Sequence, residues 1–148
     1  MSIVIKATVT GIKQLRKQLN AADETTRGAI SAAIYQKGFA IMADSTKEVP
    51  VDKGHLKGSA YVAPPKSTKD PVVEIGYGKK YGPYVHEVRG LTHHPVGKDH
   101  FLSDPLNRHK AGYTRWIQRK AKENLVRNIS WSGVPRDLPT RPPRDESK

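Results

Sequence analysis

Residues 29–59 read AISAAIYQKGFAIMADSTKEVPVDKGHLKGS, which predicts one long helix that a proline ends. On a helical wheel the large apolar side chains form two arcs, one of Ile30, Ile34 and Ile41 and the other of Tyr35, Phe39 and Met42. A helix on a protein surface needs only one such arc. We therefore expect other elements to cover this helix on two sides.

The long helix has to end before Pro50, because proline has no amide hydrogen and restricts Val49 to extended backbone. The residues that follow predict a tight turn, in which an aspartate accepts backbone hydrogen bonds and a glycine adopts positive φ. An apolar residue then anchors the chain before a strand begins. The residues of this structural turn are Pro50, Asp52, Gly54, Leu56 and Ser59.

The segments on either side of this stretch alternate between strand and helix patterns. Residues 2–9 predict a half-buried strand, residues 12–19 predict a short helix, and Asp23 is placed to cap the long helix. Further strands are expected at 59–63, 71–77 and 84–88, with loops at 64–70 and 89–100. The predicted fold is α+β, with a small mixed or mainly antiparallel sheet packed on a long central helix.

The last predicted element is a single helix that Asp104 caps and that has Pro105 in its first turn. Its apolar arc consists of Leu102, Leu106, Tyr113, Trp116 and Ile117. Its opposite, basic face consists of Arg108, Arg115, Arg119 and Lys122. Half of the formal net charge of +12 falls on this element, so the basic face is the main candidate for contact with a polyanion or an acidic partner.

The residues after the last helix lack any periodic apolar pattern. Prolines and alternating charges dominate residues 130–148, so this segment cannot build a core. We therefore divide the chain into one α+β domain, residues 1–129, and an extended or disordered proline-rich tail, residues 130–148. Trp131 is the exception in the tail, and we expect it to anchor the tail on its own domain or on a neighbouring subunit.

The composition excludes several classes of protein. The 148 residues suit one domain, and the absence of cysteine excludes a disulfide framework and a thiolate metal site. No apolar run approaches the roughly 20 residues that a membrane-spanning helix needs, and residues 1–11 do not have the pattern of a secretory signal. We expect no contact with a membrane.

A group of histidines with nearby polar residues is the only pattern that suggests catalysis. A metal-dependent nuclease of the histidine–asparagine–histidine kind would use such residues to bind a metal that activates water. The residues concerned are His93, His94, His100 and His109, with Asp99 and Asn107. The first pair lies in a predicted loop rather than in a strand–loop–helix frame, so we expect no enzyme, no metal and no cofactor.

The basic face allows a second function, that of a stand-alone basic nucleic-acid-binding protein. A helix with one cationic face can follow phosphates without reading bases. Tyr77, Tyr81 and Tyr84 would then stack on single-stranded bases, or else they close the sheet over the core. Their positions between glycines favour the core role, and no helix-turn-helix or common RNA-binding motif is present.

Three motifs, in this order, resemble those of the tail-completion, or head-to-tail joining, family of lambdoid long-tailed phages. The most specific is PVDKGHLKGS at 50–59, which fits Pro-Val-Asp-x-Gly-x-Leu-x-x-Ser. YGPYVHE at 81–87 and FLSDPL at 101–106 resemble the shorter patterns Tyr-x-x-Tyr-Val-x-Glu and Phe-Leu-x-x-x-Leu. The resemblance covers residues 1–128, and Val88-Arg89-Gly90 replaces the family's aromatic-Gly-Thr turn.

This resemblance implies a structural protein of the phage neck that works as a homo-oligomeric ring and is not an enzyme. The implied location is the head–tail junction of the virion, after synthesis in the cytoplasm of the host bacterium. The implied partners are the portal or adaptor, the head-closure protein, the tail terminator or tail tube, and double-stranded DNA that passes through the channel. The basic face would line that channel or bind adjoining rings, and Trp131 would anchor the tail on an adjacent subunit.

Overall fold

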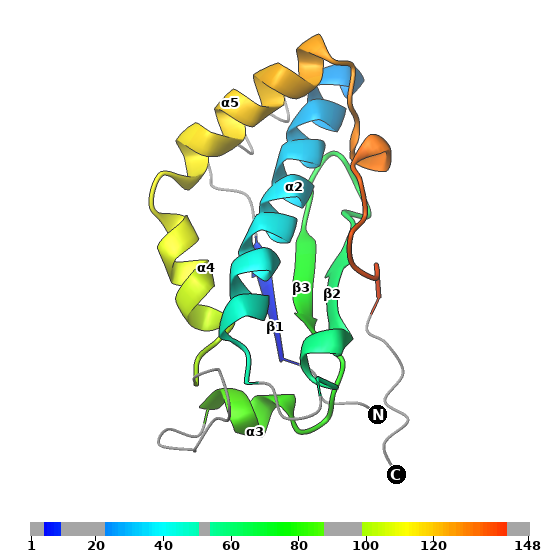
Figure 1. Cartoon of the computed structure of the whole chain (residues 1–148). Coiled ribbons are helices and arrows are strands. Elements are labelled where there is room, and N and C mark those ends of the chain that lie inside the picture. Colours follow the sequence, from blue (N-terminus) through cyan, green and yellow to red (C-terminus); the bar gives the residue numbers. More distant parts are fainter. Residues whose placement is uncertain (1–4, 10–22, 51–53, 88–98, 142–148) are drawn as a thin grey trace.

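The computed structural model describes residues 5–9, 23–50, 54–87 and 99–141 (Figure 1). These residues form the predicted α+β fold, in which the long helix α2, Glu24–Glu48, lies between a small sheet and the C-terminal helices. The helix predicted at 12–19 and the turn residue Asp52 lie outside the described residues.

Helix α2 begins and ends where the sequence predicts. The Asp23 side chain caps it by accepting a hydrogen bond of 2.8 Å from the Thr26 amide. The helix ends at Glu48, and Val49 is extended with ψ 135° because Pro50 follows it. The helix contacts β2 and β3 on one side and α4 and α5 on another, so the predicted covering on two sides is confirmed.

The sheet is antiparallel and has the strand order β1-β3-β2. Its strands are β1 (Ile5–Val9), β2 (Ala60–Ala63) and β3 (Val73–Tyr77), with Val62 opposite Ile75. Tyr77 points toward α2, where its hydroxyl lies 2.6 Å from the Ser45 Oγ. A Cβ atom at Gly38 of α2 would lie only 2.9 Å from Val73, so α2 approaches the sheet closely at this glycine.

The turn that follows α2 has the predicted chemistry at the residues that are described. Gly54 adopts φ +78°, and its carbonyl accepts a hydrogen bond from the Gly58 amide. Leu56 is buried, and its carbonyl accepts a 2.6 Å hydrogen bond from the buried Ser59 hydroxyl. The chain then passes through the 3₁₀ helix η1, Lys57–Ser59, into β2.

The strand predicted at 84–88 is wrong, because Gly82–Glu87 form the short helix α3. A hydrogen bond from the Gly82 amide to the Lys79 carbonyl forms the turn that precedes it. Pro83 favours this helix, since its fixed φ suits a first turn, where no amide hydrogen is needed.

The prediction of one continuous last helix is also wrong, because the chain forms two helices there. These helices are α4 (Ser103–Lys110) and α5 (Tyr113–Val126), and Gly112 between them adopts φ +67°. Asp104 lies in the first turn of α4 and is not its N-cap. Instead, the Nε2 atom of His86 in α3 accepts a hydrogen bond of 3.3 Å from the Ser103 amide.

The described part of the tail packs against the chain's own domain (Figure 1). The 3₁₀ helix η2, Trp131–Gly133, contacts α2, and the partly buried Trp131 packs on the core. Val134 is buried, and the carbonyl of Pro139 accepts a 2.9 Å hydrogen bond from the Val62 amide of the edge strand β2. In this structure Trp131 therefore anchors the tail within one subunit.

Asn128 ends α5 with a left-handed residue, and its replacement tests this cap. The φ angle of Asn128 is +54°. The Ile129 amide donates a hydrogen bond to the Asn124 carbonyl, and the Asn128 amide donates one to the Leu125 carbonyl. These two hydrogen bonds form a Schellman motif. We expect Asn128→Ala to lower the free energy of unfolding by about 1 kcal/mol, because alanine disfavours this φ. We expect Asn128→Gly to change it by less than ~0.5 kcal/mol. Equal effects of the two variants in urea unfolding would contradict this assignment.

Candidate nucleic-acid and partner interface

Helix α5 is held in a fixed orientation on α2. Ile117 is fully buried and Ala121 is 6% exposed, so this side of α5 faces the core. Asn124 is buried as well, and its Nδ2 donates hydrogen bonds of 3.1 Å to the Ala29 carbonyl and 3.0 Å to the Gln36 Oε1. A buried amide with two partners on α2 restricts rotation of α5, so the opposite side of α5 faces solvent.

The solvent-facing side of α5 carries a row of three cations, Arg115, Arg119 and Lys122, which we call the α5 cationic row. All three residues are exposed and are spaced by four and three positions, so they lie on one face of the helix. Among the described residues, no ion pair with a carboxylate is seen for these three side chains.

Arg108 does not belong to the α5 cationic row, although the sequence predicts one basic face for all four residues. It lies on α4 and forms an ion pair with Glu48 of α2. The prediction depended on one continuous helix, and the break at Gly112 separates Arg108 from the other three cations.

A buried lysine lies beside the α5 cationic row, and sequence reasoning missed it. Lys37 of α2 is 6% exposed, and its Nζ lies 4.6 Å from the ring centroid of Trp116 in α5. Burial lowers the pKa of Lys37, the nearby Asp44 opposes that shift, and Arg119 adds to it. The position of Trp116 on the predicted apolar arc was the available signal, because aromatic rings bind cations on their faces.

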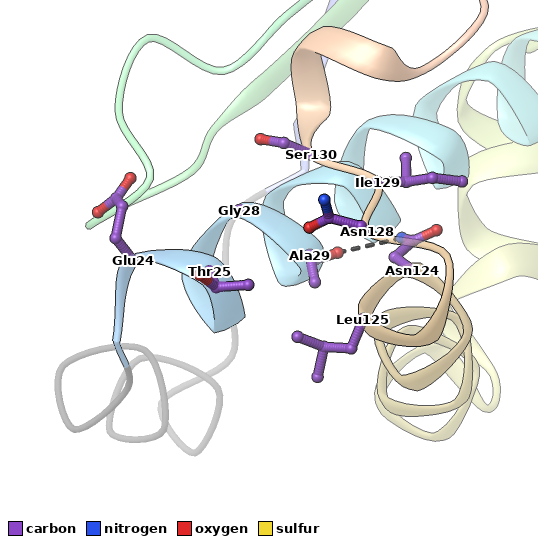
Figure 2. A pocket seen from close by; sticks show the side chains of 9 residues that line it. All are labelled: Glu24, Thr25, Gly28, Ala29, Asn124, Leu125, Asn128, Ile129 and Ser130. Atoms are coloured by element: carbon purple, nitrogen blue, oxygen red, sulfur yellow. Dashed lines mark hydrogen bonds between the residues drawn. The ribbon is translucent and has the colours of Figure 1, made fainter.

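The C-terminal end of α5 presents apolar side chains to solvent, which is a second feature that sequence reasoning missed. Leu125 is 38% exposed and Val126 is 89% exposed. Leu125 lies between two hollows. The first, of about 220 Å³, lies between the first turns of α2 and the segment that follows α5, and Figure 2 shows it with the hydrogen bond from Asn124 to Ala29. The second, of about 430 Å³, lies along the α2–α5 groove.

Helix α4 is attached to α2 by charged side chains. The Nε2 atom of His109 in α4 lies 2.7 Å from the Oδ2 atom of Asp44 in α2. The Oδ1 atom of Asp44 lies 3.5 Å from the Nζ atom of Lys47 in the same helix. The hydrogen bond with His109 is the main cause that lowers the pKa of Asp44 below its ordinary value of 3.8. Asp44 therefore stabilises the fold above pH 3.8, and this contribution is lost as the pH falls through the lowered pKa.

The Asp44–His109 pair predicts a specific change in acid stability. The variant His109→Ala should lose stability at neutral pH by at most ~1 kcal/mol, because the pair is partly exposed. Below pH 3.8 the free energy of unfolding of this variant should fall less steeply than that of the unmodified protein. The reason is that the pKa of Asp44 is lowered mainly by the hydrogen bond with His109, which the variant lacks. Urea unfolding between pH 2.5 and 7 measures both effects, and the exposed His55→Ala is the control. Parallel pH profiles for all three proteins would refute the role of the pair.

The residues that suggested a metal-dependent nuclease do not form one cluster in the described structure. His109 bonds to Asp44, while His100, with φ +51°, lies 3.3 Å from Asp99 and 4.0 Å from Glu87. Within the described ranges, no three histidine or acidic residues are arranged to hold a metal ion. His93 and His94 lie outside those ranges.

Two of the three tyrosines considered for base stacking occupy different environments. Tyr77 is fully buried in the core, where its ring meets that of Phe101 edge-on, and burial raises the pKa of its hydroxyl. Tyr81 is 42% exposed, and the side chain of Tyr84 lies outside the described set. The core role is confirmed for Tyr77.

Comparisons of the chain with protein-family models, with curated proteins and with solved structures gave no significant match. The family resemblance read from the sequence therefore stays a prediction. In the described part of the chain, no helix has the length and apolar character needed to cross a membrane.

Proposed function

We propose that this protein is a structural subunit of a phage neck, a tail-completion or head–tail connector protein that forms a ring between the DNA-filled head and the tail tube. The observation that carries the proposal is the α5 cationic row, which faces solvent on a helix whose other side is fixed to α2. The sequence resemblance over residues 1–128 supports the same role. The proposed role is not enzymatic.

The α5 cationic row suits contact with DNA that moves past it. Lysine and arginine side chains attract phosphates without reading base edges, so such contacts do not depend on sequence. A ring repeats the row once per subunit and surrounds the channel with weak, equivalent contacts. These contacts allow DNA to pass, because no single site holds it strongly.

The rigid frame of the subunit suits assembly into a ring. Helix α2 is covered on one side by the sheet and on another by α4 and α5, so the subunit keeps its shape while its outer surfaces contact neighbours. The exposed Leu125 provides apolar area near one end of α5 for contact with an adjoining neck protein.

Loss of the protein from the phage tests the proposed function. Electron microscopy of lysates without the gene should show DNA-filled heads and tails that remain separate. A copy of the gene supplied in the host should restore joined particles. Joined, infectious particles in the absence of the gene would overturn the proposal.

A stand-alone nucleic-acid-binding protein is the second candidate, because the same three cations are exposed on one helix face. That function predicts tight binding of free duplex DNA by monomer or dimer, and a steep loss of affinity with salt. Replacing Arg115, Arg119 and Lys122 by glutamine would then reduce the slope of log affinity against log salt by about 0.9 per charge. The neck function predicts weak binding of free DNA and a shallow salt dependence.

A further inference from the structure

The larger hollow beside Leu125 is an apolar groove between α2 and α5, with a volume of about 430 Å³. Its floor contains Ile30, Ile117 and Ala121, which are buried, and the partly exposed Leu125 forms one wall. Thr26, Gln118 and Lys122 complete the lining. A volume of several hundred Å³ with an apolar floor is typical of a site that accepts apolar side chains.

The charged residue that lines this groove is a cation. Lys122 lines the groove and belongs to the α5 cationic row, which continues with Arg119 and Arg115 on the same helix face. Among the described residues that line the groove, none carries a carboxylate. An occupant therefore gains electrostatic attraction if it places acidic groups along α5.

The combination of apolar groove and basic edge distinguishes between classes of partner. A DNA backbone offers phosphates to the α5 cationic row but has no apolar side chain to fill the groove or cover Leu125. At this groove a second copy of this chain is a poorer match than an acidic helix, because its 26 basic residues outnumber its 14 acidic residues. An amphipathic helix with an apolar stripe and flanking carboxylates satisfies both features.

We infer that the α2–α5 groove docks an acidic amphipathic helix of a partner protein. Apolar side chains of that helix fill the groove between Ile30 and Leu125, and its carboxylates pair with Lys122, the cation that lines the groove. Arg115 and Arg119 do not line the groove and stay available to DNA. The inference rests on the proposed structural function and deepens it by naming the chemistry of the neighbour that contacts α5.

Three matched synthetic peptides test this inference on the full chain. The first is an amphipathic helix with leucines three and four residues apart and glutamates on both sides of them. The second replaces its leucines by glutamine, and the third replaces its glutamates by glutamine. Fluorescence anisotropy should give at least about tenfold tighter binding of the first peptide than of either other peptide.

Variants of the chain locate the binding. Leu125→Gln should weaken binding of the first peptide by about tenfold or more, since it removes an apolar wall of the groove. Lys122→Gln should weaken it and reduce its salt dependence. Val126→Gln is the matched control, because Val126 is 89% exposed and does not line the groove, and it should bind like the unmodified chain. Circular dichroism checks that each variant is folded.

Three outcomes would overturn the inference. In the first, the leucine-free peptide binds as tightly as the first peptide. In the second, duplex DNA displaces the first peptide and Leu125→Gln has no effect on peptide binding, and in the third, the chain self-associates and Leu125→Gln abolishes that self-association. Failure of this experiment is distinguishable from failure of the proposed function, because the joining of heads to tails is scored separately in particles.

Discussion

The variant Gly38→Ala should lower the free energy of unfolding by about 1 to 2 kcal/mol, although alanine is the better helix former. A Cβ atom at this position would lie 2.9 Å from the Val73 Cγ1 and 3.1 Å from the Val62 Cγ1. Both methyl groups belong to β-branched side chains of strands packed against α2, so moving either one requires an unfavourable χ1 rotation or a shift of the sheet. The cost of the clash therefore exceeds the roughly 1 kcal/mol that alanine gains over glycine within a helix.

A matched glycine on the same helix separates the clash from helix propensity. At Gly28 the new Cβ atom would lie 3.0 Å from the Ser130 Oγ, the end of a side chain that can rotate away. We expect Gly28→Ala to change stability by less than ~1 kcal/mol. Urea unfolding followed by circular dichroism measures both variants, and Gly38→Leu should lose more than Gly38→Ala. If Gly38→Ala proved as stable as the unmodified chain, α2 would not approach the sheet as described.

The variant Val134→Asp should release the tail from the domain. Val134 is 5% exposed and belongs to the core, so an aspartate there would bury a charge without a partner. Release of the segment from the domain avoids that cost. We therefore expect the substitution to stabilise the state with a released tail by about 2 to 3 kcal/mol relative to the state with a packed tail. The side chain of Arg136 is already exposed, and release lets the backbone on either side of it enter the active site of trypsin. The Val62 amide then loses its hydrogen bond to the Pro139 carbonyl.

Limited proteolysis and hydrogen exchange measure the release of the tail. Cleavage after Arg136 and exchange of the Val62 amide should each accelerate by about tenfold or more, since 1.4 kcal/mol corresponds to a factor of ten. Val126→Asp introduces the same charge at a residue that is 89% exposed, and it should leave both rates unchanged. Equal rates in all three proteins would show that the tail does not depend on Val134.

The sequence was a good guide where local patterns decide the structure. The two apolar arcs of α2, its cap at Asp23 and its end before Pro50 are all present in the structure. Strands β2 and β3 lie within the predicted segments, because alternating apolar residues and turn residues define them. Gly54 adopts the positive φ that its turn requires.

The sequence failed where a single residue or a distant contact decides the structure. Gly112 separates two helices, whereas Gly28 and Gly38 lie inside α2. The sequence alone therefore does not show whether a glycine in a helical pattern ends the helix or lies within it. The burial of Val134 depends on packing with the core, which the proline-rich composition of the tail obscured. The α2–α5 groove is formed by residues far apart in the chain, so no local motif predicts it.

Cryo-electron microscopy of purified, joined phage particles is the most direct measurement of the central proposal, a ring of this protein at the head–tail junction. We predict closed-ring density at the neck into which repeated copies of this fold can be built, with α5 of each copy against DNA or an adjoining ring. Particles whose neck contains no copy of the chain would contradict the account.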